Sequence, residues 1–173
     1  FLDLHCAITN MIATPNICNS INKNNHDVAG SLDLFDAPSS GLLLVYIPNI
    51  DTLEFTPPFG NHIDFVFTNI PSNGNLNTIY AQFTALTICN SSVSYLSPSP
   101  LTPPTLEIGN HVCPQKMGEI NVVEHCGTNS FVEYSINNGT SWSISKPLYS
   151  TIPMNIFVRC KSTVDNNCYG SNN

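Results

Sequence analysis

Histidine and cysteine are among the residues of this 173-residue chain whose side chains could serve catalysis or bind a metal. The five histidines are His5, His26, His62, His111 and His125. Neither a His-x-x-x-His nor a Glu-x-x-His pattern occurs, so nothing predicts two metal ligands on one helix face. His125 precedes Cys126, but a cysteine in a disulfide lacks the thiolate needed for nucleophilic attack. We therefore expect turn or surface histidines and predict no catalytic residue, no cofactor and no metal site.

Two segments carry oxygen ligands of the kind that calcium prefers, Asn24-Asn25-His26-Asp27 and Asp165-Asn166-Asn167. Neither has the alternating acidic ligands and the terminal glutamate of an EF-hand loop. Asn and Asp side chains also cap turns, because they accept hydrogen bonds from nearby backbone N–H groups. The two segments therefore predict turns.

The seven cysteines predict a disulfide framework. They are Cys6, Cys18, Cys89, Cys113, Cys126, Cys160 and Cys168. None forms the Cys-x-x-Cys pair of a zinc or redox site, and single cysteines spread along a chain are typical of proteins in oxidising compartments. Because seven is odd, at least one is unpaired, bonded to another chain or separated from its partner.

Charged residues are unusually scarce. They make up only 10% of the chain, against about 25% in an average soluble protein, with 5 basic and 12 acidic residues. Without a basic cluster the chain does not fit a nucleic-acid binder. The longest apolar run, Leu42–Ile47, is far shorter than the roughly 20 residues of a membrane span. The chain begins at Phe1 without a signal-peptide pattern, which we interpret as a mature or excised segment.

Short runs of β-branched and aromatic residues, separated by Pro, Asn and Gly, predict strands rather than helices. Val28–Phe35 alternates between apolar and polar positions, and Leu42–Ile47 is a continuous apolar run of strand length. Ile63–Phe67 and Thr78–Phe83 follow, separated by Pro71-Ser72-Asn73-Gly74 with its Asn-Gly turn pair. Short strands at this spacing predict a β-sandwich.

A Pro-rich stretch, Ser97–Pro104, favours extended backbone and offers few donors to a sheet. We place a domain boundary there. The prediction is a first β-sandwich module at 1–97, a linker at 98–104 and a second, smaller β-sandwich module at 105–173.

The second module is predicted to contain strands at Glu119–Glu124, Phe131–Ile136 and Asn155–Val158. Asn137-Asn138-Gly139 predicts a hairpin turn between Ile136 and the segment that holds Trp142. A unit this small would benefit from covalent cross-links.

This layout suggests disulfide pairings within each module. In the second, Cys126 would pair with Cys160, and Cys113 with Cys168. In the first, Cys18 and Cys89 lie near the first and last strands and would pair. This scheme leaves Cys6 unpaired or bonded to another molecule. A competing scheme pairs Cys6 or Cys18 with Cys113, because Cys113 lies at the domain junction.

Short motifs in both modules carry a family resemblance. In the first they are Cys6-Ala7-Ile8, Cys18-Asn19, Ala37–Leu43, Phe55–Phe59, Ile70–Gly74 and Ala81–Thr84. This module resembles repeat domains of very long secreted surface proteins of Bacteroidetes, notably gliding and adhesion proteins of flavobacteria. In the second they are Cys113, Gly118-Glu119-Ile120, Glu133–Ile136, Gly139–Trp142 and Cys168. This module resembles the Cys-bounded repeats of the SprB type, but has Cys126 and Cys160 in addition.

The resemblance implies two tandem Ig-like β-sandwich modules in an all-β, secreted, extracellular chain. It implies adhesion, motility or filament structure, and no enzymatic activity. The expected partners are other copies of the chain or neighbouring modules of a longer protein. The apolar alternation of Phe1–Ile8 could add a strand to a neighbour's sheet edge and so form a head-to-tail fibre. Alternatively, this segment is the first strand of its own sandwich.

The sequence offers two possible relations to sugar, covalent glycosylation and non-covalent glycan binding. Asp51-Thr52-Leu53 fits the O-glycosylation pattern that the resemblance implies, and Asn90 and Asn138 each begin an Asn-x-Ser/Thr pattern. The second relation is a platform of Trp142, Tyr134 and Tyr149 that contacts surface glycans, although a single Trp more often anchors a core. A carbohydrate-binding module of a secreted polysaccharide-degrading enzyme is therefore the alternative function.

Overall fold

The computed structural model describes residues 6–19, 23–108, 120–122, 126, 129–147, 155–165 and 167–170. Every regular element within them is a β-strand, which confirms the predicted all-β class. Contacts divide the chain into two compact units, Phe1–Pro98 and Ser99–Asn173. The division falls in the Pro-rich stretch, and each unit is described by itself.

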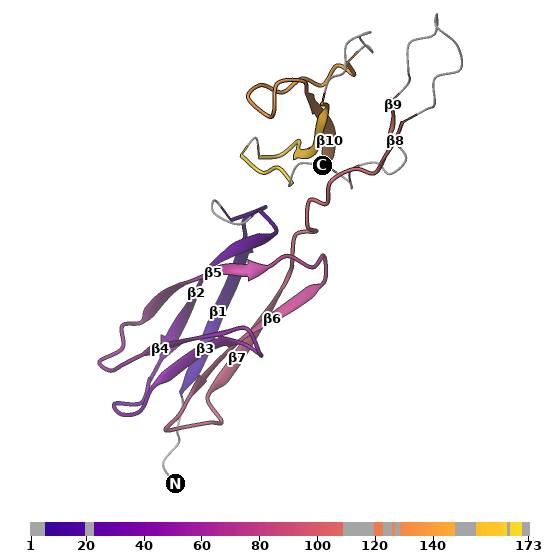
Figure 1. Cartoon of the computed structure of the whole chain (residues 1–173). Coiled ribbons are helices and arrows are strands. Elements are labelled where there is room, and N and C mark those ends of the chain that lie inside the picture. Colours follow the sequence, from indigo (N-terminus) through magenta and orange to yellow (C-terminus); the bar gives the residue numbers. More distant parts are fainter. Residues whose placement is uncertain are drawn as a thin grey trace, which may run out of the picture. The chain divides into compact units, whose positions relative to one another are not determined.

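The first unit consists of two antiparallel sheets (Figure 1). The three-stranded sheet has the order β1-β2-β5, with bounds Ala7–Pro15, Asn25–Phe35 and His62–Pro71. The four-stranded sheet has the order β4-β3-β6-β7, with bounds Asp51–Phe55, Leu43–Ile47, Leu76–Phe83 and Asn90–Leu96. These strand orders are compatible with an Ig-like sandwich.

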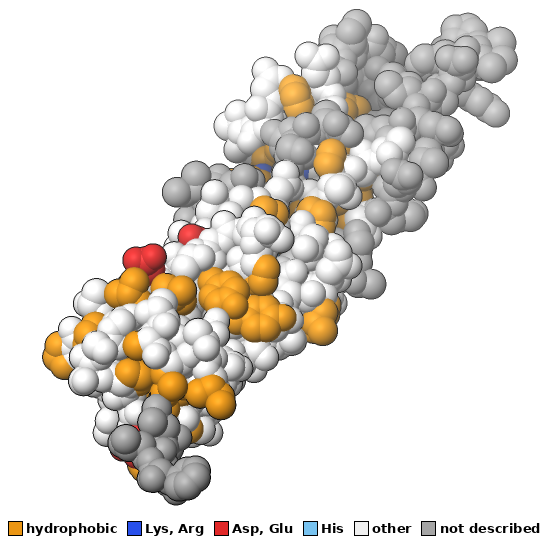
Figure 2. All heavy atoms as spheres, turned by 90° about the horizontal axis from the view of Figure 1, so that it is seen from below, with side chains coloured by type: hydrophobic (Ala, Val, Ile, Leu, Met, Phe, Trp, Pro, Cys, Tyr) orange, Lys and Arg blue, Asp and Glu red, His pale blue; other side chains and the backbone are white. Residues whose placement is uncertain are grey.

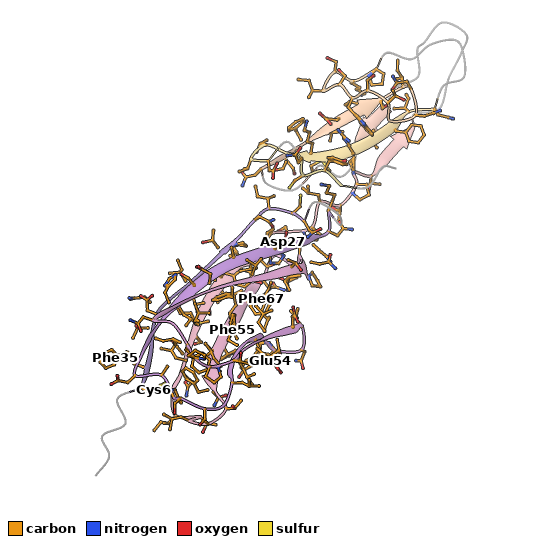
Figure 3. All side chains as sticks on the ribbon, turned by 90° about the vertical axis from the view of Figure 1, so that its left-hand side faces the viewer. Cys6, Asp27, Phe35, Glu54, Phe55 and Phe67 are labelled. Carbon is orange, nitrogen blue, oxygen red and sulfur yellow. A yellow bond between two sulfur atoms is a disulfide. The ribbon has the colours of Figure 1, made fainter. Side chains whose placement is uncertain are left out.

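Alternating side chains of both sheets fill one core. In β2, Val28, Leu32 and Leu34 are buried, as the sequence pattern predicts. Figure 3 shows Phe67 of β5 between the sheets, whereas Phe35 at the end of β2 points outward and is 59% exposed. The two inward faces therefore form a continuous apolar interior, which is the main source of stability for such a unit.

Gly30 occupies an inward position of β2 that no larger residue could take. A Cβ atom there would overlap the ring of Phe65 and the carbonyl oxygen of Ile12. The missing side chain thus lets the Phe65 ring and β1 approach the β2 backbone closely.

The amino-terminal segment pairs within its own sheet as far as it is described. Ala7 lies opposite Phe35, and Ile8 lies opposite Leu34. This placement supports the alternative in which the segment begins the chain's own sandwich. Residues 1–5, on which a fibre contact would also depend, lie outside the described residues.

The described part of the second unit contains two antiparallel strand pairs. The first joins β8 (Leu106–Ile108) to β9 (Ile120–Val122). The second joins β10 (Ser130–Ser135) to β11 (Phe157–Ser162), so the last strand starts two residues later than predicted and extends further. A complete second sandwich stays a prediction.

The predicted hairpin turn after β10 is confirmed. Asn138 and Gly139 both have positive φ, 55° and 79°. Two consecutive residues in this region are typical of a type I′ turn, which Asn-Gly favours. Beyond it the chain returns to β10, where Tyr134 and Ser143 exchange backbone hydrogen bonds of 2.8 and 2.9 Å.

Candidate functional site

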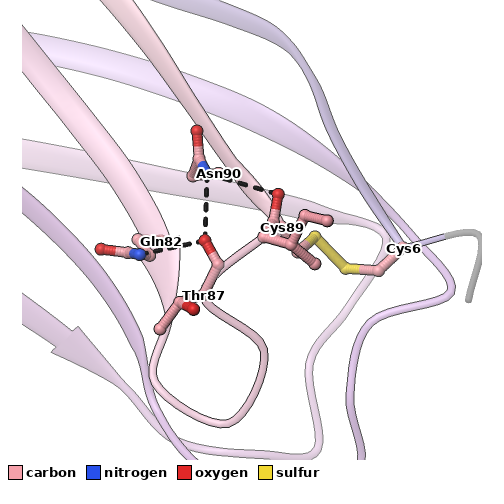
Figure 4. The surroundings of a disulfide bond; sticks show 6 residues. Cys6, Gln82, Thr87, Cys89 and Asn90 are labelled. Atoms are coloured by element: carbon pink, nitrogen blue, oxygen red, sulfur yellow. Dashed lines mark hydrogen bonds between the residues drawn. A yellow bond between two sulfur atoms is a disulfide. The ribbon is translucent and has the colours of Figure 1, made fainter.

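A disulfide between Cys6 and Cys89 closes one end of the first unit (Figure 4). Cys6 directly precedes β1 and Cys89 directly precedes β7, so the bond joins the three-stranded sheet to the four-stranded one. Two expectations are thereby wrong: Cys6 is not left unpaired or bonded to another molecule, and Cys89 does not pair with Cys18. The reason is that β1 contacts β7 across the sandwich, which brings the starts of both strands together.

In the second unit the predicted bond between Cys126 and Cys160 is confirmed, with the two Cα atoms 5.5 Å apart. Cys18 is oxidised to a disulfide, and so is Cys168. Cys113, the expected partner of Cys168, lies outside the described residues. All six cysteines in the described part of the chain are therefore oxidised, which indicates an oxidising environment.

The loop before Cys89 is fastened by two amide side chains (Figure 4). Asn90 donates from Nδ2 to the carbonyls of Thr87, at 3.0 Å, and Ile88, at 3.3 Å. Gln82 donates from Nε2 to the same Thr87 carbonyl at 3.0 Å. The amide nitrogen of Asn90, to which an N-linked sugar would be attached, thus already serves the folded loop.

The other two candidate glycosylation residues are exposed. Thr52 lies on the outer face of β4, and its backbone N–H is bonded to the carboxylate of Asp51 at 2.8 Å. Asn138 lies in the hairpin turn described above. Both side chains are therefore accessible to a modifying enzyme.

His26 is fully buried, which corrects the expectation of a turn or surface histidine. Its Nδ1 lies 3.2 Å from Ser72 Oγ, and its Nε2 lies 3.2 Å from Tyr95 Oη. Tyr95 Oη also accepts a hydrogen bond from Asn77 at 3.3 Å, which leaves its proton for His26 Nε2. We therefore assign the neutral tautomer that is protonated on Nδ1.

Burial lowers the pKa of His26, and the nearby Asp27 carboxylate and the Ile70 backbone offset only part of this effect. Since β2 belongs to one sheet and β7 to the other, the His26–Tyr95 contact ties the two sheets together through polar atoms. Figure 3 places Cys6 and Asp27, the neighbour of His26, near opposite ends of the first unit. One end thus carries the disulfide and the other this polar contact.

His62 is a surface residue, as expected, and belongs to a polar row across the three-stranded sheet. Its Nδ1 lies 2.6 Å from Asp33 Oδ1, and its Nε2 lies 3.3 Å from Asp64 Oδ1. Asn10 Nδ2 donates to the other oxygen of Asp33 at 2.8 Å. The hydrogen bond to Asp33 is the main cause that raises the pKa of His62, and it lowers the pKa of Asp33 in return.

The same row shows what His62 can do chemically. A hollow beside it is lined by Thr9, Phe35, Asp36 and Asn61. Both ring nitrogens face carboxylates, so neither is directed at a hydroxyl or thiol that it could activate. The arrangement can hold a proton between two acidic groups, but it lacks the nucleophile–base contact of a hydrolytic triad.

Of the two segments predicted to be turns, Asn24–Asp27 is a turn only at Asn24, because Asn25 to Asp27 begin β2. In the second segment, Asn166 lies outside the described residues. Asp27 Oδ1 accepts from Asn19 Nδ2 at 2.6 Å and from the Asn69 backbone at 2.8 Å. Asp165 Oδ1 accepts from the backbone N–H of Asn167 at 2.8 Å, an Asx turn. Within the described residues, no three His, Cys, Asp or Glu side chains are grouped so as to hold a metal ion.

Neither of the two described members of the predicted aromatic platform, Trp142 and Tyr134, offers a free ring face as expected. The guanidinium of Arg159 lies 4.1 Å from the centre of the Trp142 ring and covers one of its faces. The indole N–H donates to the Gly139 carbonyl at 3.0 Å. Tyr134 is buried, so it cannot serve as a surface contact, which corrects that expectation. Tyr149 lies outside the described residues.

Arg159 instead organises a structural stack. Its guanidinium also lies 4.3 Å from the centre of the Tyr169 ring. Its Nε and Nη2 donate to one oxygen of the buried Glu133 at 2.9 and 2.7 Å, and Lys161 lies 3.5 Å from the other oxygen. Trp142 is therefore held by a cation–π contact of the kind that orders a small unit.

Within the described residues, a stacked tyrosine pair lies on the outer face of the four-stranded sheet, with Tyr80 exposed and Tyr46 half-buried. Tyr46 of β3 and Tyr80 of β6 are opposite each other in register, with ring centres 5.5 Å apart and planes 22° apart. This pair was not predicted from the sequence. The alternation of residues 43–47 and 76–83 indicates that each tyrosine faces outward, since both fall between core positions, but it does not show that they are neighbours.

Sequence comparison assigns no family: no protein-family model matches the chain, and no curated protein matches it significantly. In the part of the chain that the structure describes, no helix is long and apolar enough to cross a membrane.

Proposed function

We propose that this chain is a structural or adhesive segment of a bacterial extracellular surface protein or filament and that it is not an enzyme. The observation that carries the proposal is the Cys6–Cys89 disulfide, which fixes the two sheets of the first unit to each other. Such a bond persists only where thiols are not kept reduced. Secretion and a place at the cell surface are part of the proposal.

The exterior supports this role. Figure 2 shows hydrophobic side chains in separate clusters among uncharged polar groups, with few charged ones. A surface of this kind depends on Asn, Ser and Thr for solubility, as does the chain as a whole with its 10% charged residues. It suits contact with neutral surfaces or with further copies of the same module better than contact with a polyelectrolyte.

The two histidines that the structure describes support a role without catalysis, whereas His5, His111 and His125 lie outside the described residues. His26 is enclosed between the two sheets, and both ring nitrogens of His62 face carboxylates. Neither is poised as a general base toward a substrate, which would require a free nitrogen facing an open site.

The partners in this proposal are neighbouring modules of a longer chain or other copies of the chain. Ala7 and Ile8 already pair with β2. A head-to-tail fibre formed through Phe1–Ile8 would therefore require the five residues before Cys6, or the displacement of the start of β1.

The test combines attachment, self-association and turnover. Beads coated with the oxidised chain are placed under flow on surfaces coated with extracellular polysaccharide or protein, and light scattering reports self-association. We expect attachment or assembly, and we expect mass spectrometry to find every polymer at its original length. Shortened polymers would show an enzyme, and the lack of both attachment and assembly would overturn the adhesive or structural role.

The second candidate is a carbohydrate-binding module of a secreted polysaccharide-degrading enzyme. The observation that favours it is the stacked Tyr46–Tyr80 pair on the outer face of the four-stranded sheet. It differs from the first in predicting that a catalytic domain accompanies this chain in the full-length protein. Sequencing the complete gene decides between the two.

A further inference from the structure

The outer face of the four-stranded sheet presents an aromatic centre with uncharged surroundings. Tyr46 and Tyr80 lie on the two central strands, and their neighbours in the same register row are Thr52 and Ser92. Tyr80 is 39% exposed. No hydrogen bond occupies either phenol hydroxyl among the described residues, so both are available to a ligand.

The adjoining rows add hydroxyl and amide groups. Thr78 and Ser94 are hydrogen-bonded to each other at 2.9 Å on one side of the pair. Gln82 and Asn90 lie on the other side, opposite each other in register. Each of these side-chain amides donates a hydrogen bond to the Thr87 carbonyl, so the loop fixes the position of both amides.

Charge is nearly absent from this face. The outward side chains of β3, β6 and β7 are all uncharged, and the charged residues of the neighbouring β4 are both acidic, Asp51 and Glu54. Without a Lys or Arg in these strands, an anionic polymer finds no counter-charge.

We propose that this face binds a neutral oligosaccharide through Tyr46 and Tyr80. A pyranose ring has an apolar C–H face, which stacks on aromatic rings, and a rim of hydroxyl groups, which need donors and acceptors. The tyrosine pair supplies the aromatic rings for the C–H face. The hydroxyls, the amides and Glu54 supply the donors and acceptors for the sugar hydroxyl groups. The uncharged face matches an uncharged ligand.

A protein partner would use a different part of the same face. Leu76 and Leu96 are opposite each other at one end of β6 and β7 and are 68% and 66% exposed. Protein interfaces of about 800 Å² per partner are centred on buried apolar and aromatic anchors. The leucine pair therefore provides a matched control, since it shares the sheet and the exposure but lacks aromatic rings.

This inference rests on the proposed adhesive function, for which it names the ligand class. The experiment titrates the oxidised chain with neutral oligosaccharides of glucose, mannose and galactose and follows binding by calorimetry. We expect saturable binding to at least one of them. Tyr80→Ala and Tyr46→Ala should each weaken it about tenfold, whereas Tyr80→Trp should retain it and Leu76→Ser should leave it unchanged. Thermal unfolding of each variant checks that the fold is intact.

Two outcomes would overturn the inference. One is the absence of binding to any of these sugars at millimolar concentration, and the other is binding that Leu76→Ser weakens as much as Tyr80→Ala does. Either result refutes sugar binding at this face but not the proposed structural or adhesive function, provided that the chain still self-associates or adheres to protein. If a sugar is cleaved during the titration, the proposed function fails instead.

Discussion

At the scale of single residues, the two described histidines have opposite effects on stability as the pH changes. Burial lowers the pKa of His26 below its ordinary value of 6.5. The fold therefore favours the neutral ring, and this contribution is fully present above pH 6.5 and is lost as the pH falls through the lowered pKa. His62 has a raised pKa, so its contribution is present below pH 6.5 and is lost as the pH rises through that pKa.

We predict that acid destabilises the first unit through His26. Denaturant unfolding at a series of pH values should show a midpoint that decreases below pH 6.5. His26→Gln keeps a polar side chain between Ser72 and Tyr95 but cannot titrate, so it should flatten the profile in this range. His62→Asn should leave the loss below pH 6.5 in place and instead remove the decrease in stability that accompanies deprotonation of His62 above pH 6.5. An unchanged profile in His26→Gln would contradict the assignment.

Trp142 is predicted to be a structural residue. Trp142→Ala removes the ring that covers Arg159 and should destabilise the second unit by about 2 kcal/mol. Trp142→Phe keeps an aromatic face for Arg159 and should recover part of the loss. Thermal unfolding by calorimetry, which follows the second unit separately from the first, measures both effects. Full stability in Trp142→Ala would mean that the stack contributes nothing.

At the scale of the element, β2 depends on the missing side chain of Gly30. Gly30→Ala places a Cβ against the Phe65 ring and the Ile12 carbonyl, so we expect a loss of about 2 kcal/mol from overpacking. Ala29→Val is the matched control, because Ala29 is the next residue and is exposed on the outer face. Chemical denaturation of both variants checks the prediction, and equal stabilities would refute it.

Strands with strong alternation could be predicted from sequence, and polar edge strands could not. The pattern Val28–Phe35 locates β2 because every second side chain enters the core. In β7, Asn90–Leu96, the inward positions include Val93 and Tyr95 and the rest are mostly Asn and Ser, so its composition is that of a loop. An edge strand with one face toward solvent needs apolar residues only on its inward face.

The candidate site required information on pairing between distant segments. The Tyr46–Tyr80 contact depends on the register of β3 with β6, and Cys6 meets Cys89 only because β1 lies beside β7. Neither relation leaves a local signal in the sequence. The Cys126–Cys160 bond could be predicted, since both residues lie in one small unit, and the Asn138-Gly139 turn could be predicted from local backbone preference.

At the scale of the whole molecule, the disulfides should carry much of the stability. Replacing Cys6 and Cys89 together by Ser opens a loop of 83 residues and should cost about 4 kcal/mol, because the unfolded chain gains conformational freedom. The Cys126→Ser/Cys160→Ser double variant is the control, since it should lower the stability of the second unit and leave the first unchanged. Thermal unfolding by calorimetry separates the two units. Equal effects of both variants on the first unit would contradict this assignment.

The Cys6–Cys89 bond also determines how this unit responds to tension. A force applied along the backbone on the amino-terminal side of Cys6 passes through the two sulfur atoms to the start of β7, and the sandwich between them is not stretched. The shielded 83 residues would extend by roughly 280 Å if they were released. An oxidised chain pulled at its ends should therefore lengthen little in this unit, and a reductant should convert the same unit into one that yields under load and absorbs mechanical work.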